Sequence, residues 1–197
     1  MWRFVNKSIL AVCLSGLCLL MSSCASDLKG RVEAMVEAHN SHDVERELSF
    51  YTDDARYEMV GAWVRQGKEE LRRLLEKDAI FNSQIFLTDV EVAGDVVTCQ
   101  AKEQNDLFMT AGIDALDYEF WQFGFEDGLI KAVRAKHTKE TTAAMKELTL
   151  SFRRWVSERR SQESADLRFE GGLTEENASK VLKLVREWRE DMKGKKQ

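Results

Sequence analysis

The sequence contains no proline among its 197 residues, although average usage would supply about ten. Polyproline linkers, PxxP ligands and collagen-like repeats are therefore excluded, and no cis-proline can shape a turn. The chain must turn at glycine, asparagine and aspartate instead, as at Gly94, at Gly128 and at the pair Gly171 and Gly172.

Basic residues are also too few for one class of function. The chain has 29 Lys and Arg against 34 Asp and Glu, a formal net charge of −5. This balance argues against a nucleic-acid binder that neutralises phosphates. The hydrophobic share of 44% is ordinary for a globular protein. The length therefore predicts one folded domain with appendages rather than a disordered chain.

The N-terminus differs in composition from the rest of the chain. Arg3 and Lys7 precede a run of 14 uncharged residues, 8–21 (SILAVCLSGLCLLM). As a helix this run would span about 21 Å, which is short of the ~30 Å hydrocarbon core of a bilayer. A basic start, a short apolar segment and small residues before a cleavage point are typical of a secretory signal peptide. We therefore predict a signal peptide over residues 1–23.

The segment Leu20–Cys24 (LMSSC) resembles the lipobox of bacterial lipoproteins. The resemblance implies that the Cys24 thiol receives a diacylglycerol, that cleavage makes this cysteine the N-terminus, and that residues 24–27 form a short tether. Two or three acyl chains would anchor the protein stably. Because Ala25 follows the cysteine, the resemblance to Gram-negative lipoproteins implies the periplasmic face of the outer membrane. A signal peptide cut nearby, with Cys24 unmodified, is the alternative.

Cysteine and histidine are scarce in the expected mature chain. Of four cysteines, two lie in the predicted signal peptide and Cys24 would be acylated, so Cys99 alone remains. No intramolecular disulfide is therefore expected. The three histidines, His39, His42 and His137, do not have the spacing of a zinc site. We expect neither a metal nor another cofactor.

Apolar periodicity along the mature chain is first helical and then strand-like. Val32, Met35 and Val36 recur at helical spacing, whereas Ala93–Asp95 and Glu126–Gly128 are turn signals between strand-like runs. These patterns predict helices over Leu28–Asn40, Val44–Tyr51 and Lys68–Lys77, and strands over Arg56–Val64, Ser83–Val92, Asp95–Gln104, Asp114–Phe125 and Leu129–His137. Helices followed by an antiparallel meander predict an α+β fold.

A helical pattern returns after His137. Met145, Phe152 and Trp155 lie on one stripe of a helix expected over Thr138–Arg160, and a second apolar stripe begins after Thr174. We expect residues 139–197 to form a helical extension whose stripes pack together or on the preceding domain. A coiled-coil partner helix is the alternative.

Three phrases of the sequence resemble a known fold family. AHNSHD at Ala38–Asp43, FYTDDARY at Phe50–Tyr57 and RQGKEEL at Arg65–Leu71 resemble the nuclear transport factor 2-like superfamily, closest to its SnoaL-like and ketosteroid-isomerase-like branches. The resemblance covers residues 28–138. It implies a cone, in which a strongly curved antiparallel sheet packs on the N-terminal helices around an apolar cavity. Because this fold hosts enzymes and non-catalytic binders alike, it does not decide the function.

Resemblance to the isomerase branch implies three catalytic positions, and all three are apolar here. The general base falls on Met59, the tyrosine on Met35 and the second acid on Phe120, which argues against steroid-isomerase chemistry. Together with strand alternation, the resemblance predicts a cavity lined by Tyr57, Met59, Trp63, Cys99, Glu103, Tyr118, Phe120 and His137. Glu103 and His137 are the titratable pair of this set and could serve as general base and acid.

These features favour a binding protein over an enzyme. We predict a lipid-anchored cell-envelope protein whose cone binds an apolar or amphipathic small ligand or a protein partner without catalysis. One alternative is a dehydratase, cyclase or hydrolase that uses Glu103 and His137. Another is an envelope assembly scaffold that acts through the C-terminal helices. We also expect a hydrogen-bonded core role for His39 and no nucleic-acid partner. The family resemblance makes a homodimer through the sheet face one option, and coverage of that face by the C-terminal helices is the alternative.

Overall fold

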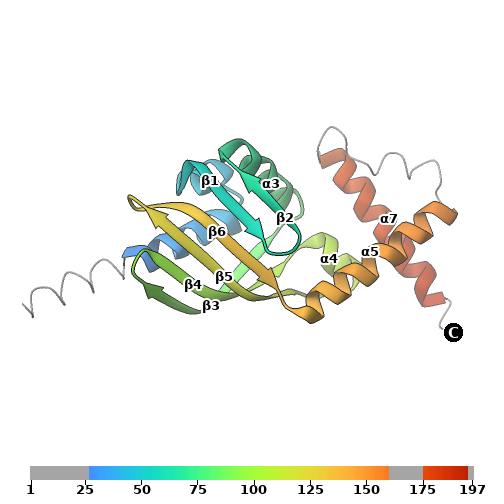
Figure 1. Ribbon diagram of the computed structural model, residues 1–197. Coiled ribbons are helices and arrows are strands. Elements are labelled where there is room, and N and C mark those ends of the chain that lie inside the picture. Colours follow the sequence, from blue (N-terminus) through green and yellow to red (C-terminus); the bar gives the residue numbers. More distant parts are fainter. Residues whose placement is uncertain (1–26, 160–174, 195–197) are drawn as a thin grey trace, which may run out of the picture.

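The computed structural model describes residues 27–159 and 175–194 (Figure 1). The predicted signal peptide and Cys24 lie outside these residues. The described elements are an N-terminal helix (residues 27–40), α2 (Val44–Leu48), β1 (Tyr51–Met59), β2 (Trp63–Gln66), α3 (Lys68–Ile80), β3 (Gln84–Ala93), β4 (Val96–Gln104), α4 (Asp106–Ala111), β5 (Leu116–Glu126), β6 (Leu129–His137), α5 (Lys139–Arg159) and α7 (Glu175–Gly194).

The strands form a six-stranded sheet in the order β2-β1-β6-β5-β4-β3. The three hairpins pair antiparallel, as do β4 and β5, whereas β1 and β6 pair parallel. The single strand predicted over Arg56–Val64 is wrong: the chain turns at Gly61, whose φ of +81° favours glycine, so that two strands form there. The turn places the aromatic residue Trp63 beside Met59.

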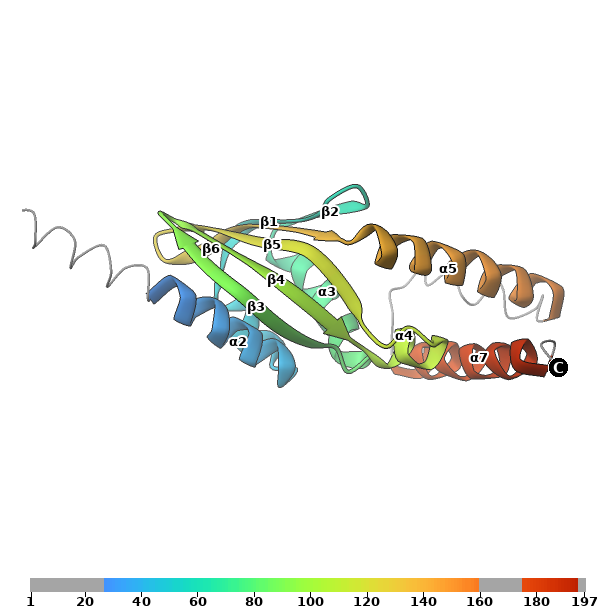
Figure 2. The same cartoon turned by 90° about the horizontal axis from the view of Figure 1, so that it is seen from below.

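The sheet curves because its ladders are interrupted by bulges. Register shifts occur between Thr88 and Glu91 in β3 and between Tyr118 and Phe120 in β5. An extra residue on one strand bends that strand and increases its twist. Figure 2 shows the curved sheet with the N-terminal helix, α2 and α3 against one side of it. The predicted α+β cone on N-terminal helices, with a helical extension, is confirmed.

Short polar residues start and stop the helices that close the cone. The Asp43 carboxylate accepts a hydrogen bond from the Arg46 N–H at 3.0 Å and begins α2. The Asn105 side chain accepts from the Phe108 N–H at 3.0 Å and begins α4, which ends at Gly112 in the left-handed conformation. These caps fix the positions at which the helices leave and rejoin the sheet.

The buried apolar side chains form two separate clusters. The larger one fills the cone between the sheet and the N-terminal helices, and Phe123, Ile130 and Val97 lie fully buried within it. The smaller one joins α4, α5 and α7 and is centred on Val185 and Trp188. In Figure 2, α5 and α7 extend together beyond the end of the sheet. Within residues 27–159 and 175–194, no helix combines the length and apolar character needed to cross a bilayer.

Candidate functional site

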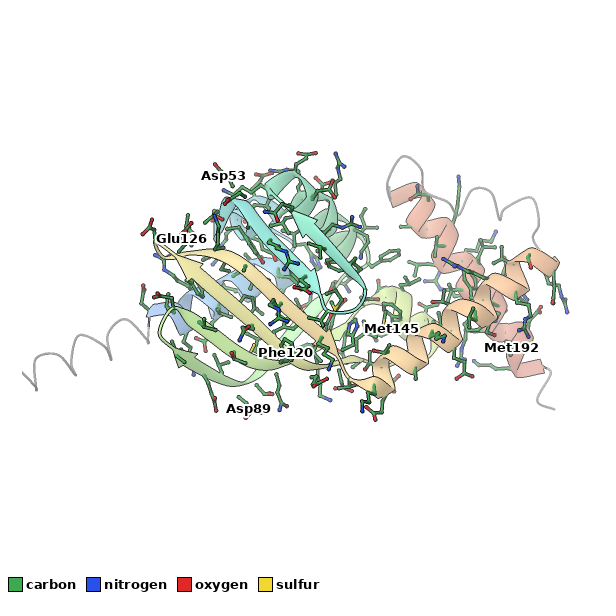
Figure 3. All side chains as sticks on the ribbon, viewed as in Figure 1. Asp53, Asp89, Phe120, Glu126, Met145 and Met192 are labelled. Carbon is green, nitrogen blue, oxygen red and sulfur yellow. The ribbon has the colours of Figure 1, made fainter. Side chains whose placement is uncertain are left out.

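A partly enclosed cavity of about 150 Å³ lies inside the cone. The sheet supplies one side of it and the helices supply the other. The strand residues are Tyr51, Tyr57, Met59, Trp63, Ile85, Glu103, Leu116, Tyr118, Trp121 and His137; the helical residues are Met35, His39, Glu47, Leu74, Leu75, Lys77, Asp78, Phe108 and Met145. Met145 extends from the start of α5 toward the cone (Figure 3). The cavity wall thus combines apolar and aromatic side chains with several titratable groups.

A connected group of aromatic rings forms the sheet side of the cavity. Tyr57 stacks on Trp63 with ring centroids 5.5 Å apart and meets Trp121 edge-on at 6.3 Å. Trp121 packs edge-on against Tyr118 at 5.3 Å. Aromatic pairs prefer such offset or perpendicular contacts. Because neighbouring strands supply the rings, the sheet holds them in fixed relative positions.

Glu103 projects into the cavity from β4 and is held by neutral donors. Tyr118 Oη donates to its Oε2 at 2.6 Å. Ser83 Oγ and Asn105 Nδ2 donate to its Oε1 at 3.1 and 2.8 Å. Among the described residues, no Lys, Arg or His side chain forms an ion pair with this carboxylate. The Glu103 charge is therefore hydrogen-bonded but has no counter-charge of its own.

A buried chain of hydrogen bonds runs from Glu103 toward α2. His39 Nε2 lies 3.3 Å from Ser83 Oγ, and His39 Nδ1 lies 3.1 Å from a carboxylate oxygen of Glu47. Burial disfavours charge on His39, but the hydrogen bond and negative charge of Glu47 outweigh it, so the pKa of His39 is raised. The prediction of a hydrogen-bonded core role for His39 is confirmed. Ser83 is only 1% exposed and donates to Glu103, so it is no accessible nucleophile.

Asp78 adds a third carboxylate from the end of α3. Burial raises its pKa to about 6 and the nearby Glu103 charge adds to the shift, while the Lys77 ammonium acts in the opposite direction. Lys77 Nζ lies 3.3 Å from Asp78 Oδ1. Of the three cavity carboxylates, Asp78 is therefore paired with a lysine and Glu47 with a histidine.

Two ring nitrogens in the cavity wall are buried without a hydrogen-bond partner among the described residues. They are Trp121 Nε1 and His137 Nε2. Trp121 is 4% exposed, and its indole N–H can only donate. Burial lowers the pKa of His137, although Glu103 acts against this shift, so its imidazole is neutral at neutral pH. Buried polar groups in folded proteins are normally paired, so each of these two nitrogens could accept a partner from a molecule in the cavity.

Most of the cavity residues predicted from the sequence lie where they were expected. Tyr57, Met59, Trp63, Glu103, Tyr118 and His137 line the cavity. Met35 and Met59, at two of the positions that the isomerase branch uses, contribute thioethers to the wall. Cys24 lies outside the described residues.

Two predicted cavity residues are placed elsewhere. Phe120 does not line the cavity, because the bulge after Tyr118 reverses the alternation of β5 and brings Trp121 inward in its place. Cys99 is 2% exposed in the apolar core and does not reach the cavity. Burial raises the pKa of its thiol to about 12, so Cys99 is not a nucleophile.

Sequence reasoning missed Trp121, Asp78, Glu47 and Ser83. Strict period-two alternation assigns Trp121 to the outer face, and only the bulge reverses this. Asp78 and Glu47 belong to short helices whose charged residues suggest a solvated face. The one available signal was His39, an imidazole on an apolar stripe, which requires polar partners when it is buried. Within the described part of the chain, no group of three or more His, Cys, Asp or Glu side chains could hold a metal ion.

The sequence matches no protein-family model and no curated protein. Solved structures do match the cone. SalBIII, an epoxide hydrolase/cyclase-like enzyme of pyran ring formation in salinomycin, is 17% identical with a TM-score of 0.54; the match covers 59% of this chain and 94% of that one. An LEH-like epoxide hydrolase of M. tuberculosis is also 17% identical, with a TM-score of 0.52. That match covers 61% of this chain and 89% of the hydrolase.

A third solved structure has no assigned function. It is a protein of unknown function with a cystatin-like fold from Methylobium petroleophilum, 12% identical with a TM-score of 0.51, and the match covers 58% of this chain and 78% of that one. At these identities the likeness shows the fold and nothing of the chemistry. The cone therefore has the nuclear transport factor 2-like fold that the sequence resembles.

Proposed function

We propose that this protein is a non-catalytic binding protein whose cone takes up one small apolar or amphipathic molecule. The observation that carries the proposal is the partly enclosed cavity of the cone, whose wall combines aromatic rings with a few polar groups. Two of its residues, Trp121 and His137, have a ring nitrogen without a partner among the described residues. A buried polar group left unpaired costs about 1–3 kcal/mol. A ligand oxygen or nitrogen that pairs with either group removes that cost, and the aromatic wall supplies apolar contact.

The cavity volume limits the size of the ligand. A volume of about 150 Å³ equals that of an engineered protein cavity that binds benzene. It lies below the roughly 300–1,000 Å³ of pockets for drug-sized ligands. A ligand of single-ring size therefore fits the cone, whereas a steroid does not.

Phenol is a suitable first probe because it combines one ring with one hydroxyl. We expect phenol to shift the Trp121 indole resonance in NMR spectra, and Trp121→Phe to weaken binding about five- to tenfold through the lost hydrogen bond. Trp188→Phe is the matched control, since Trp188 also has a buried indole nitrogen without a partner among the described residues but lies in the other cluster. Binding that Trp121→Phe leaves unchanged, or no binding of phenol, would contradict the proposal.

A hydrolase is the second candidate, and one observation favours it. Tyr118 contacts both members of the predicted acid–base pair: its hydroxyl donates to Glu103, and its ring lies 4.4 Å from the His137 ring. Two structural neighbours are an epoxide hydrolase and an epoxide hydrolase/cyclase-like enzyme, so a small epoxide is the natural test substrate. The neutral state of His137 disfavours this role, because a general acid must carry a proton to donate.

Styrene oxide separates the two candidates. An enzyme would convert it to the diol, and Glu103→Gln would abolish turnover while Glu119→Gln, on the exposed outer face, would not. The binding proposal predicts no diol above the rate in buffer, as measured by mass spectrometry. Diol formation that depends on Glu103 would replace it with the hydrolase.

We further propose that the protein is a lipid-anchored cell-envelope protein. The support is the sequence of residues 1–24, in which a basic start and a short uncharged run precede the lipobox-like segment Leu20–Cys24. Metabolic labelling with a palmitate analogue should mark the wild-type protein, and Cys24→Ser should abolish the signal. Equal labelling of both proteins would exclude the anchor. In fractionated cells, the labelled protein should accompany the outer membrane.

A further inference from the structure

We infer that the molecule bound in the cone is a small organic cation, an ammonium group held by the Glu103 carboxylate and the ring of aromatic side chains around it. This inference rests on the proposed binding function and names the chemical class of the ligand. It is carried by the uncompensated charge of Glu103, by the aromatic cage and by the size of the cavity.

The charge balance inside the cavity is negative. Three carboxylates line it, those of Glu47, Asp78 and Glu103, against one lysine and two histidines. Glu47 has His39 at 3.1 Å and Asp78 has Lys77 at 3.3 Å. Glu103 alone of the three has no cationic partner among the described residues. A charge removed from water without a counter-charge is costly, and a cationic ligand would supply the missing one.

The hydrogen bonds of Glu103 leave one position open. A carboxylate has about four acceptor sites on its two oxygens. Ser83 and Asn105 donate to Oε1, whereas Tyr118 alone donates to Oε2. These donors fix the orientation of the carboxylate, and the remaining site on Oε2 lies beside the Tyr118 hydroxyl. An ammonium group beside this position supplies the positive charge that the three neutral donors do not.

Four aromatic rings in the cavity wall, called the aromatic cage below, begin with Tyr118 beside Glu103 and offer the kind of surface that attracts ammonium ions. Tyr57, Trp63, Tyr118 and Trp121 are linked through ring contacts of 5.3 to 6.3 Å and all line the cavity. The negative face of an aromatic ring attracts cations, and clusters of Trp and Tyr recognise quaternary ammonium groups in this way. Trp63 already has one cation near it, since the Arg65 guanidinium lies 5.6 Å from its ring centroid.

The remaining polar atoms add a second requirement. The Trp121 indole N–H can only donate, so the ligand also needs an acceptor such as a hydroxyl. The neutral His137 can offer a ring nitrogen as an acceptor or, in its other tautomer, as a donor. A volume of about 150 Å³ accommodates a compact amino alcohol. Choline joins a quaternary ammonium to one hydroxyl, so it supplies the positive charge and the acceptor, and it is the probe we choose.

The test compares choline with its neutral isostere, the alcohol in which a quaternary carbon replaces the ammonium nitrogen. The two have the same shape and differ in charge. With the whole protein in isothermal titration calorimetry, we expect choline to bind at least tenfold more tightly than the neutral alcohol. Equal binding, tighter binding of the neutral alcohol, or no binding of choline would overturn the inference. Binding of phenol would still stand in those cases, which separates failure of this inference from failure of the proposed function.

Two variants assign the preference to the cage. Glu103→Gln keeps the shape of the side chain and should reduce the choline preference to less than threefold, whereas Glu119→Gln, on the exposed outer face, should keep it. Trp63→Leu should weaken the binding of choline more than that of the neutral alcohol, because only the cation loses an electrostatic attraction to the ring. A Glu103→Gln variant that retains the full preference would overturn the role of this carboxylate. The wild-type comparison needs no variant to fold.

Discussion

The buried side chains of the cone and those of the C-terminal extension have different roles. The cone cluster surrounds a cavity and includes a buried hydrogen-bonded chain from Glu47 to Glu103. The extension cluster is nearly all apolar, and at its edge Trp155 Nε1 donates a hydrogen bond to Asp191 at 2.8 Å. Both contain a tryptophan whose indole nitrogen has no partner within the described residues, Trp121 and Trp188. An unpartnered indole therefore does not by itself distinguish a binding site from a packing site.

The charges around the two tryptophans do distinguish them. A hollow of about 350 Å³ beside Trp188 is lined by Arg189 and Lys193 with one carboxylate, Glu147. The cone cavity has the opposite balance, and Trp121 contacts the rings of Tyr57 and Tyr118 in its wall. The comparison teaches that the cone holds the groups that select a ligand, while the extension holds α7 against α4 and α5. The predictions below test this division.

The largest effect on stability should come from removing a large buried side chain from either cluster. Phe123→Ala and Trp188→Ala each remove a large buried ring, 0% and 4% exposed, and should each cost about 3–5 kcal/mol of local stability. In denaturant titrations, Phe123→Ala should unfold the cone early and abolish phenol binding. Trp188→Ala should loosen only the extension and leave phenol affinity within twofold. Loss of binding in both variants would show that the clusters form one unit.

Asp78→Asn should remove a pH dependence that belongs to the cone. An unfolded aspartate has a pKa of about 3.9, and in the cone burial raises the pKa of Asp78 to about 6. A raised pKa stabilises the fold below pH 4, and this contribution is lost as the pH rises through 6. The wild type should therefore lose about 2–3 kcal/mol relative to Asp78→Asn between pH 4 and pH 7.

Chemical denaturation at a series of pH values measures this difference. The raised pKa of His39 adds a loss above about pH 6.5, but it acts in wild type and variant alike. Asp53→Asn, which removes an exposed carboxylate, controls for the loss of one charge. A constant gap between wild type and Asp78→Asn across the range would exclude Asp78 as the source.

The local structure of the cone could be predicted where the chain signals it locally. Turn signals at Gly94 and Gly128 place both long hairpins, and Asp43 correctly precedes a helix. The parallel pairing of β1 with β6 could not be predicted, because strands far apart in the sequence carry no signal of their partner. The division of the first predicted strand into β1 and β2 depends on a single turn at Gly61.

The site was harder to predict than the fold for a related reason. Alternation identifies Tyr118 as inward-facing, but the bulge that follows is set by pairing with β4 and β6, and it exchanges Phe120 for Trp121. Cys99 faces inward, as the alternation of β4 predicts, but neighbouring core side chains cover it, so it does not reach the cavity. A face can be predicted from spacing, whereas the part of that face that reaches a cavity depends on how the helices cover it.

Gly112→Ala should reduce the stability of the packing between α4 and α7 by about 1–2 kcal/mol. Gly112 has a φ of +89°, which is costly for any residue with a Cβ. An added Cβ would also lie 2.4 Å from an Arg189 nitrogen, so the guanidinium must move away from its position near the Trp188 ring. Trp188 fluorescence should report this change. Gly94→Ala has similar backbone strain and no atom within 4 Å, so it should leave Trp188 unchanged; an equal response would refute the steric contact.

The smallest effect is expected at Phe120, and it tests which face of β5 binds. Since the bulge places this ring outside the cavity, Phe120→Leu should change the free energy of unfolding by less than about 1 kcal/mol and choline or phenol affinity by less than twofold. Trp121→Leu, one residue along, should weaken phenol binding about tenfold or more, because both ring contact and the indole donor are lost. If the two variants exchanged these effects, β5 would follow strict alternation and the cavity wall assigned to the cone would be wrong.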